Sequence, residues 1–365
     1  MKRILSVVLL LSTFNSFAQK PETFAKTITA NDLKKHLFIV ASKEMEGRET
    51  ATPGQRKAAA YIENHFKEVG LQPGNNGSYQ MYFDVYQDSL TDATLEVNGK
   101  AFQLDKDFNP SIGNIPATLR FSEVVMIGAN STDSLKNANL AGKLVMIVGN
   151  VPSARRGQGG GLLALLQSKG IAGILSVSNV FPRTSPLSRK GNQSINAFKR
   201  ALAPQQYSIS ENVARAITGS AYDLVKEDNA VVKTFPANVL LEVKKATLTA
   251  QSSNVVGVLP GTDLKDEYLF ITAHYDHLGK RDTVIYYGAD DDGSGTVGVL
   301  ELAEAFAKAK AAGKGPRRSI VFMTVSGEEK GLWGSEHYAS NPIFPLDKTT
   351  ADLNIDMIGR SDTER

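Results

Sequence analysis

The C-terminal third of the chain alternates short apolar runs with a long helical segment, and this alternation limits the possible folds most strongly. Three runs rich in β-branched residues, 254–259, 268–273 and 319–325, have the length and composition of buried strands. Residues 294–312, between the last two runs, show the apolar spacing of a helix. The pattern predicts an α/β fold with a mixed, mostly parallel central sheet flanked by helices.

Two capped helices are expected near the N-terminus. Thr29 or Asn31 can cap a helix over residues 32–42, in which the apolar residues fall at helical spacing. A second helix is expected to start at Thr52-Pro53-Gly54 and to end at Gly70, because proline suits a first helical position and glycine a helix end.

The middle of the chain has a different character. Residues 142–149 and 170–177 have the pattern of buried strands, with a glycine-rich turn at 157–161 between them. The stretch 106–235 contains no histidine, so we expect a small β-rich inserted domain without obvious chemistry of its own. The predicted organisation is a signal peptide at 1–18, one domain divided over 19–105 and 236–365, and an insert at 106–235.

The first residues have the pattern of a secretory signal peptide. Lys2 and Arg3 precede an apolar run at 4–11, and small residues in Ser16-Phe17-Ala18 predict cleavage after Ala18. This apolar run is far shorter than the roughly 20 residues of a membrane span, so no membrane partner is expected after cleavage. The chain has no cysteine for a disulfide or a lipid anchor. We therefore expect an exported protein, periplasmic or extracellular.

The charge balance argues against a polyanionic partner. The chain has 41 basic and 38 acidic residues, and removal of Lys2 and Arg3 leaves it near neutrality. A neutral chain gives no electrostatic support for binding to nucleic acid or to an anionic membrane.

Four polar segments follow predicted strands or precede the predicted helix. Each alone is also the pattern of a surface histidine or of an ordinary helix cap. Together they place a histidine and at least five carboxylates at the edge of a sheet where ligands bind in α/β folds. Such a concentration of negative charge favours a divalent cation, and mixed histidine and carboxylate ligands suit zinc. The segments are 273–277, 288–295, 326–331 and 354–357.

The spacing within these segments suggests roles for individual residues. His274 and Asp276 are two apart at a strand end and project to one face, so Asp276 can accept the second ring N–H of His274. Glu328 and Glu329 are expected to begin a helix, where adjacent side chains point about 100° apart. One glutamate can then bind metal while the other acts as a general base. Asp291 lies where the chain turns into the helix.

These motifs, in this order, resemble the zinc aminopeptidase family that includes aminopeptidase Y, the vibrio-type leucyl aminopeptidases and the glutamate carboxypeptidases. Residues 46–54 are similar to the N-terminal helix region of that family, and residues 106–235 resemble its protease-associated domain. The resemblance implies hydrolysis of peptides, most closely as an aminopeptidase rather than a carboxypeptidase. The site residues that it implies are the metal ligands His274, Asp291, Glu329 and Asp356, the general base Glu328, and Asp276 beside His274.

The resemblance also implies two zinc ions in a complete site, each bound by the bridging Asp291 and two further side chains. His274 and Asp356 would complete one site. The other would need Glu329 and a histidine downstream of 354–357, which the chain lacks. The expectation is therefore a truncated chain that is a poor catalyst.

A further expectation from the family concerns the backbone. The peptide bond between Asp291 and Asp292 is expected to be cis.

Two other functions stay open at this point. A receptor-like or binding protein without catalysis can use the same scaffold, and a glutaminyl cyclase has a related fold with a single zinc. Among the remaining histidines, His277 is expected to be a loop residue near the site rather than a ligand. His36 and His65 are expected to be surface or packing residues on the N-terminal helices.

Overall fold

A computed structural model describes residues 21–149, 161–197, 203–223 and 231–361. The predicted signal peptide and its cleavage site lie outside these residues. The chain divides into two compact units: unit 1 comprises the chain up to Phe83 and from Gln251, and unit 2 comprises Asp84–Ala250. Within the described residues, no helix combines the length and the apolar character that a membrane crossing needs.

Unit 1 begins with helices, as the capping pattern predicts. Helix α2 (Ala30–Val40) follows a short α1 (Pro21–Ala25), and the Thr29 side chain accepts a hydrogen bond from the Asp32 amide. Helix α3 (Pro53–Glu68) has Thr52 as its N-cap. The two helices are joined through η1 (Lys43–Arg48). Both helix predictions are confirmed to within two residues.

The sheet of unit 1 has three parallel strands in its C-terminal part. Strand β11 (Leu264–His274) lies between β14 (Arg318–Val325) and β15 (Thr349–Asn354) and is parallel to both. The last part of β10 (Val232–Leu259) pairs antiparallel with β14, and β1 (Gln72–Pro73) pairs with β10. This mixed, mostly parallel sheet confirms the predicted fold class.

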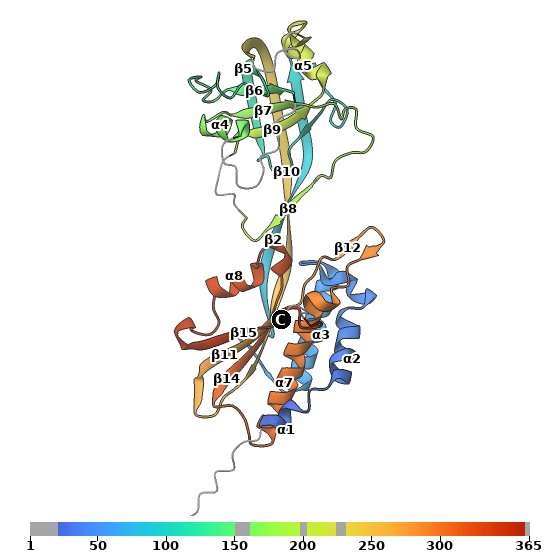
Figure 1. The fold of residues 1–365 in the computed structure, drawn as a ribbon, viewed down its shortest axis with the longest axis vertical. Helices are drawn as coiled ribbons and strands as arrows, with labels where there is room; N and C mark the ends of the chain where they lie inside the picture. Colours follow the sequence, from blue (N-terminus) through green and yellow to red (C-terminus); the bar gives the residue numbers. More distant parts are fainter. Residues whose placement is uncertain (1–20, 150–160, 198–202, 224–230, 362–365) are drawn as a thin grey trace, which may run out of the picture. The chain divides into compact units, whose positions relative to one another are not determined.

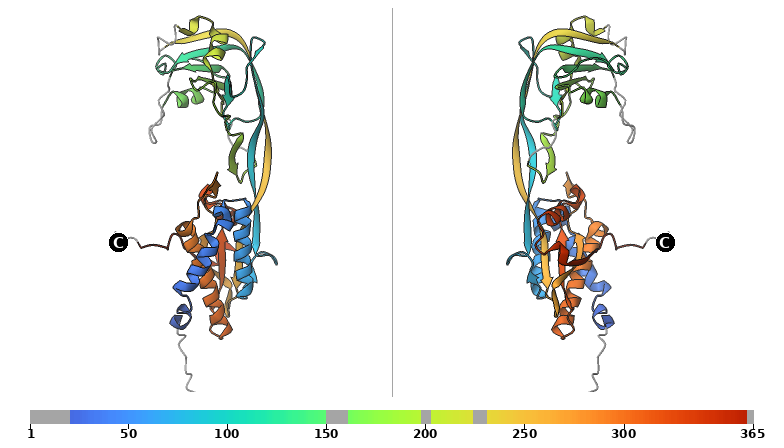
Figure 2. Two further views of the ribbon diagram at one scale, coloured as in Figure 1. Left: turned by 90° about the vertical axis from the view of Figure 1, so that its right-hand side faces the viewer. Right: turned by 90° about the vertical axis from the view of Figure 1, so that its left-hand side faces the viewer.

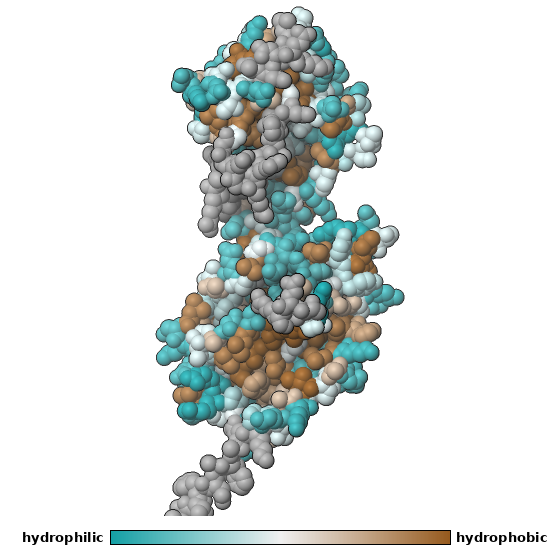
Figure 3. Space-filling model, viewed as in Figure 1, coloured by the Kyte–Doolittle hydropathy of each residue, from teal (hydrophilic) through white to brown (hydrophobic). Residues whose placement is uncertain are grey.

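Helices cover the sheet because their apolar faces match its buried strands. Helices α3 and α7 (Gly295–Ala311) lie along one face, and α8 (Trp333–Ser340) lies on the other (Figures 1 and 2). Phe322 of β14 is fully buried in the core between the sheet and helices α3 and α7. Figure 3 shows apolar residues gathered over β11, β14, β15 and α7 on the viewed face. The remaining short elements of the unit are β12 (Lys280–Arg281), β13 (Val284–Ile285), η2 (Ala289–Ser294), η3 (Glu328–Lys330) and η4 (Leu346–Lys348).

The continuous helix that was expected from Glu328 through His337 does not form, although a short 3-10 helix begins at Glu328. Glu328 and Glu329 lie in the short η3 turn, and α8 begins only at Trp333. Gly331 has φ 106° and Leu332 has φ 63°, so two successive left-handed residues interrupt the helix. His337 therefore lies on α8, which is not continuous with the turn that carries Glu329.

Unit 2 covers Asp84–Ala250, a longer stretch of sequence than the segment 106–235 that was expected as an insert. The long strands β2 (Gln80–Val97) and β10 continue into it and contribute buried residues such as Leu95 and Val243 to its core. Four parallel strands form its centre: β5 (Ala117–Gly128), β6 (Leu144–Val148), β7 (Gly173–Val177) and β9 (Gln205–Ile209). The other elements are β3 (Lys100–Ala101), β4 (Phe108–Pro110), α4 (Leu162–Ser168), β8 (Lys190–Ser194) and α5 (Glu211–Thr218).

Candidate metal centre

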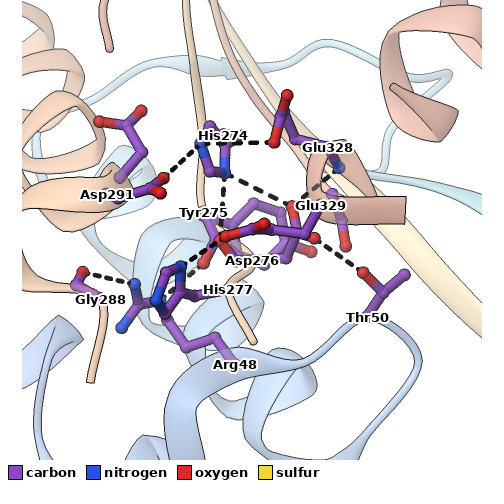
Figure 4. Close-up of polar contacts among 12 residues, drawn as sticks. Arg48, Thr50, His274, Tyr275, Asp276, His277, Gly288, Asp291, Glu328 and Glu329 are labelled. Atoms are coloured by element: carbon purple, nitrogen blue, oxygen red, sulfur yellow. Dashed lines mark hydrogen bonds and ion pairs between the residues drawn. The ribbon is translucent and has the colours of Figure 1, made fainter. Parts of the chain in front are cut away.

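The predicted site residues gather at one edge of the unit 1 sheet. Strands β11, β14 and β15 are parallel, and His274 pairs in register with Val325 while Thr272 pairs with Asn354. The segments that follow the three strands therefore leave the sheet at the same edge, and the turn η2 lies beside them before α7. Figure 4 shows Asp291 and Glu328 on either side of His274.

His274 is held in one orientation by its ring hydrogen bond. The side chain is 4% exposed, and Nδ1 lies 3.1 Å from the main-chain carbonyl oxygen of Asp276. A carbonyl oxygen only accepts, so Nδ1 carries the proton when the ring is neutral, and Nε2 presents its lone pair to the site. This Nε2 lies 3.2 Å from Oδ1 of Asp291. Burial lowers the pKa of His274, but the nearby carboxylates outweigh burial and raise it to about 9.

Asp276 supports the site with both its main chain and its side chain. Its carboxylate lies 3.7 Å from Nδ1 of His274, so the carbonyl oxygen, rather than the carboxylate, makes the closer contact with the ring. The carboxylate is fully buried and accepts hydrogen bonds from the Thr50 hydroxyl at 2.8 Å and the Glu328 amide at 3.2 Å. Asp276 thereby ties β11 to the N-terminal segment and to the turn that carries Glu328.

One group of metal-ligating atoms consists of His274, Asp292 and Asp356, whose ligand atoms lie within 4.8 Å of one another. Asp292 is fully buried, and its Oδ1 accepts hydrogen bonds from the amides of Gly295 and Met357. Its Oδ2 is buried without a hydrogen-bond partner. Burial raises the pKa of Asp292 to about 7, because the nearby His274 and the two amide hydrogen bonds do not fully compensate its buried charge. A cation at this place would do so.

The second group consists of His277, Asp291 and Glu329, again within 4.8 Å. Nδ1 of His277 lies 2.6 Å from Oε1 of Glu329, yet both atoms are buried without a hydrogen bond of acceptable geometry. Two metal-ligating atoms that point toward each other without a hydrogen bond between them are compatible with a cation bound by both. Asp291 lies in this group and also contacts His274 of the first group, so it stands between the two.

The structure therefore joins all six predicted residues but divides them differently from the expectation. Asp292, rather than Asp291, shares a ligand group with His274 and Asp356. The peptide bond between Asp291 and Asp292 is cis, as predicted. Glu328 belongs to neither of the two groups of metal-ligating atoms found among the described residues. Its Oε2 lies 3.9 Å from Nε2 of His274. Burial raises the pKa of the Glu328 carboxyl above its usual range.

Arg48 holds the surroundings of the site together. Its guanidinium is fully buried and donates four hydrogen bonds to main-chain carbonyls. Gly47 beside it has φ 69°, and a Cβ there would lie 2.4 Å from the carbonyl oxygens of Gly279 and Tyr286. This close approach requires glycine. The acceptors of the Arg48 bonds are Val40, Tyr275, Tyr287 and Gly288.

Four residues at the centre were missed or set aside at the sequence level. His277 was expected in a loop near the site rather than as a ligand; it lies in the loop after β11, and one of its ring nitrogens joins the second group of metal-ligating atoms. Arg48 and Thr50 lie in a segment noted for its family resemblance, but no local pattern marks a buried arginine. Asp292 was treated as a neighbour of Asp291.

Comparison with known proteins finds a family match in the C-terminal third of the chain. Residues 254–365 match the family model described as peptidase family M28. A probable zinc metalloprotease of Leptosphaeria maculans is 34% identical over 117 residues, which is 31% of this chain and 26% of that protein. Aminopeptidase YwaD of Bacillus subtilis is 28% identical over 166 residues, 45% of this chain and 33% of the relative. The matches thus span a quarter to a third of these curated relatives.

A solved structure extends the likeness in fold. The aminopeptidase from Aneurinibacillus sp. strain AM-1 superposes with a TM-score of 0.50 at 21% identity, covering 94% of this chain and 73% of that one. Over residues 254–365 the matches agree with the expected resemblance to zinc peptidases. The likeness of residues 106–235 to a protease-associated domain stays a prediction.

Proposed function

We propose that this chain, whose residues 254–365 match peptidase family M28, is a zinc-dependent aminopeptidase that removes N-terminal residues from peptides. The observation that carries the proposal is the meeting of two histidine and carboxylate groups at one sheet edge, with Glu328 beside them and in neither. A structural metal site needs no such additional carboxylate, whereas hydrolysis needs a general base.

The donor atoms fit zinc. His274, Asp292 and Asp356 would hold one ion, and His277, Asp291 and Glu329 would hold a second. Among the described residues, Oδ2 of Asp292 and Oε1 of Glu329 are buried without a hydrogen-bond partner, and these two atoms support the assignment. Asp291 would bridge the ions, as the family resemblance implies.

Zinc, when bound, supplies Lewis acidity toward the scissile carbonyl and toward water. The proton transfers belong to Glu328. Its carboxylate lies 3.9 Å from Nε2 of His274 and belongs to neither ligand group, so it can take a proton from the attacking water. The same carboxyl can then return the proton to the leaving amine. Its main-chain amide, bonded to Asp276, holds the residue in place for both steps.

The proposed location of the enzyme outside the cytoplasm follows from its N-terminal sequence. Cleavage after Ala18 would release the protein to the periplasm or the extracellular space, with peptides as its substrates. Neither nucleic acid nor a membrane is a proposed partner. In this proposal His277 takes the ligand position for which a downstream histidine was expected.

The test replaces Glu328 with glutamine, which keeps the size of the side chain but removes the base. We expect the Glu328→Gln protein to bind as much zinc as the wild type and to lose about 10²–10⁴-fold in turnover of aminoacyl-nitroanilides. Glu336→Gln, a matched change at an exposed position of α8, should leave both properties unchanged.

The outcomes separate the competing functions. Near-normal turnover in Glu328→Gln would refute the proposal. Cyclisation of N-terminal glutamine peptides by the wild type, without release of amino acids, would favour a glutaminyl cyclase. Absence of any turnover in a zinc-loaded wild-type protein would favour a binding protein.

A further inference from the structure

A third cluster of metal-ligating side chains lies among helices α2, α3 and α7. His36 of α2, His65 of α3 and Glu304 of α7 each present one ligand atom within 4.8 Å of the others. Glu304 is nine residues beyond Gly295, where α7 begins beside the strand-end centre, so it lies about 14 Å further along the helix axis. The cluster is therefore separate from the candidate metal centre.

The hydrogen bonds of the two imidazoles leave one nitrogen of each available to a cation. Nε2 of His65 lies 3.2 Å from the carbonyl oxygen of Leu300, which only accepts, so this nitrogen carries the proton and Nδ1 keeps its lone pair. Nδ1 of His36 lies 2.6 Å from the Tyr61 hydroxyl, which can accept the ring proton. Protein metal sites orient their histidines through such outer contacts.

Glu301 adds a buried carboxylate to the cluster. Its side chain is 2% exposed, and Oε1 lies 3.4 Å from Nε2 of His36 without a hydrogen-bond partner. An ionised carboxylate is rarely buried without compensation. Glu304 has Lys308 as an ion-pair partner, but both side chains are partly exposed, and such surface pairs are weak and readily exchanged.

The surroundings give an ion access and leave the imidazoles neutral. The cluster lines an open hollow of about 690 Å³. Burial lowers the pKa of both His36 and His65, which keeps their rings unprotonated near neutral pH. Metal ligation by histidine requires this neutral form. The two histidines, expected as surface or packing residues, pack against each other and also lie close to Glu301 and Glu304.

We propose that His36, His65 and Glu304 form an additional zinc site, with the buried carboxylate of Glu301 beside it. Two imidazoles and one carboxylate are a donor set that zinc accepts, with water completing the coordination. The ion would cross-link helices from the N-terminal and C-terminal parts of unit 1, so its role is to stabilise that unit. The inference does not depend on the proposed peptidase activity.

The first test counts zinc in purified variants at equilibrium with a fixed free zinc concentration. His36→Gln and Glu304→Gln should each bind one zinc fewer per chain than the wild type, and each should lose part of the zinc-dependent rise in Tm. Glu68→Gln is the matched control, because Glu68 lines the same hollow but is not in the ligand group, and it should bind like the wild type. Unchanged zinc content in both ligand variants would overturn the site, as would an equal loss in the control.

A second test uses the unaltered protein. Crystals equilibrated with zinc should show an anomalous scattering peak at the zinc edge between His36, His65 and Glu304. No peak there, in crystals that show zinc elsewhere or nowhere, would mean that the cluster is a buried histidine–glutamate pair without metal. Because neither test measures hydrolysis, failure of the site and failure of the peptidase proposal are distinguishable.

Discussion

Arg48 offers the sharpest test of how the candidate centre is held. Its guanidinium is fully buried and donates to four main-chain carbonyls, on helix α2, after strand β11 and ahead of the turn η2. Burial lowers the pKa of Arg48 to about 10, so it stays charged at neutral pH. Arg48→Met keeps a long apolar stem and removes all the donors.

The expected cost follows from the hydrogen bonds that are lost. Four hydrogen bonds to buried or partly buried carbonyls would be lost, at about 1 kcal/mol each, so the free energy of unfolding should fall by about 4 kcal/mol. For a unit of this size that corresponds to a decrease in Tm of about 8–16 °C. Arg48→Lys keeps the charge but cannot reach all four acceptors, and about half of that loss is expected.

Fluorescence during urea unfolding provides the assay, because Trp333 is the only tryptophan and lies in unit 1. Arg281→Met is the matched control: its side chain is 52% exposed and pairs with Glu49, so a loss below about 1 kcal/mol is expected. A loss for Arg48→Met no larger than for Arg281→Met would refute the reasoning, since the buried bonds would then contribute little.

Three further predictions concern the metal sites. Asp276→Asn should weaken zinc binding about 10–100-fold in a zinc titration, because the Asp276 carboxylate lies 3.7 Å from Nδ1 of His274 and holds the Thr50 hydroxyl and the Glu328 amide beside the site. Thr50→Val, which removes one donor to Asp276, should have a smaller effect. Removal of metal with a chelator should lower Tm. Zinc at 100 times its Kd should then restore about 2.7 kcal/mol of unfolding free energy per site. A Tm that changes with neither treatment would contradict bound zinc. Burial, with Glu304 nearby, raises the pKa of Glu301 from 4.5 to about 7, so the folded protein holds this proton more tightly than the unfolded chain. In chelator, stability should therefore fall as pH rises from 4.5 to 7, and Glu301→Gln should flatten the fall in urea midpoints.

Local patterns in the sequence were sufficient to predict the main helices and strands of unit 1, and to predict at which edge of the sheet the candidate site residues lie. The strand predicted at 319–325 is β14 (Arg318–Val325), and the helix predicted at 294–312 is α7 (Gly295–Ala311). Such patterns work because burial on one or both faces of a regular element repeats with the period of that element. Parallel strands then bring their carboxyl ends together, which unites His274, Glu328 and Asp356.

The helix expected at Glu328 shows where local patterns fail. Acidic residues followed by Trp333 and Tyr338 are compatible with one continuous helix. The left-handed Gly331 and Leu332 break it, and the tertiary packing of Trp333 against Gly327 accompanies the break.

Residue types and order along the chain determined that this protein has an α/β unit with a sheet edge rich in histidine and carboxylates, because those properties depend on periodicity and on the ends of parallel strands. Only the tertiary structure decided which carboxylate faces which imidazole. It brings Arg48 to the carbonyl of Tyr275, His277 to Glu329, and His36 to Glu304, pairs that are distant along the chain. Contacts of this kind depend on how helices and turns pack in three dimensions, and no local period in the sequence records that packing.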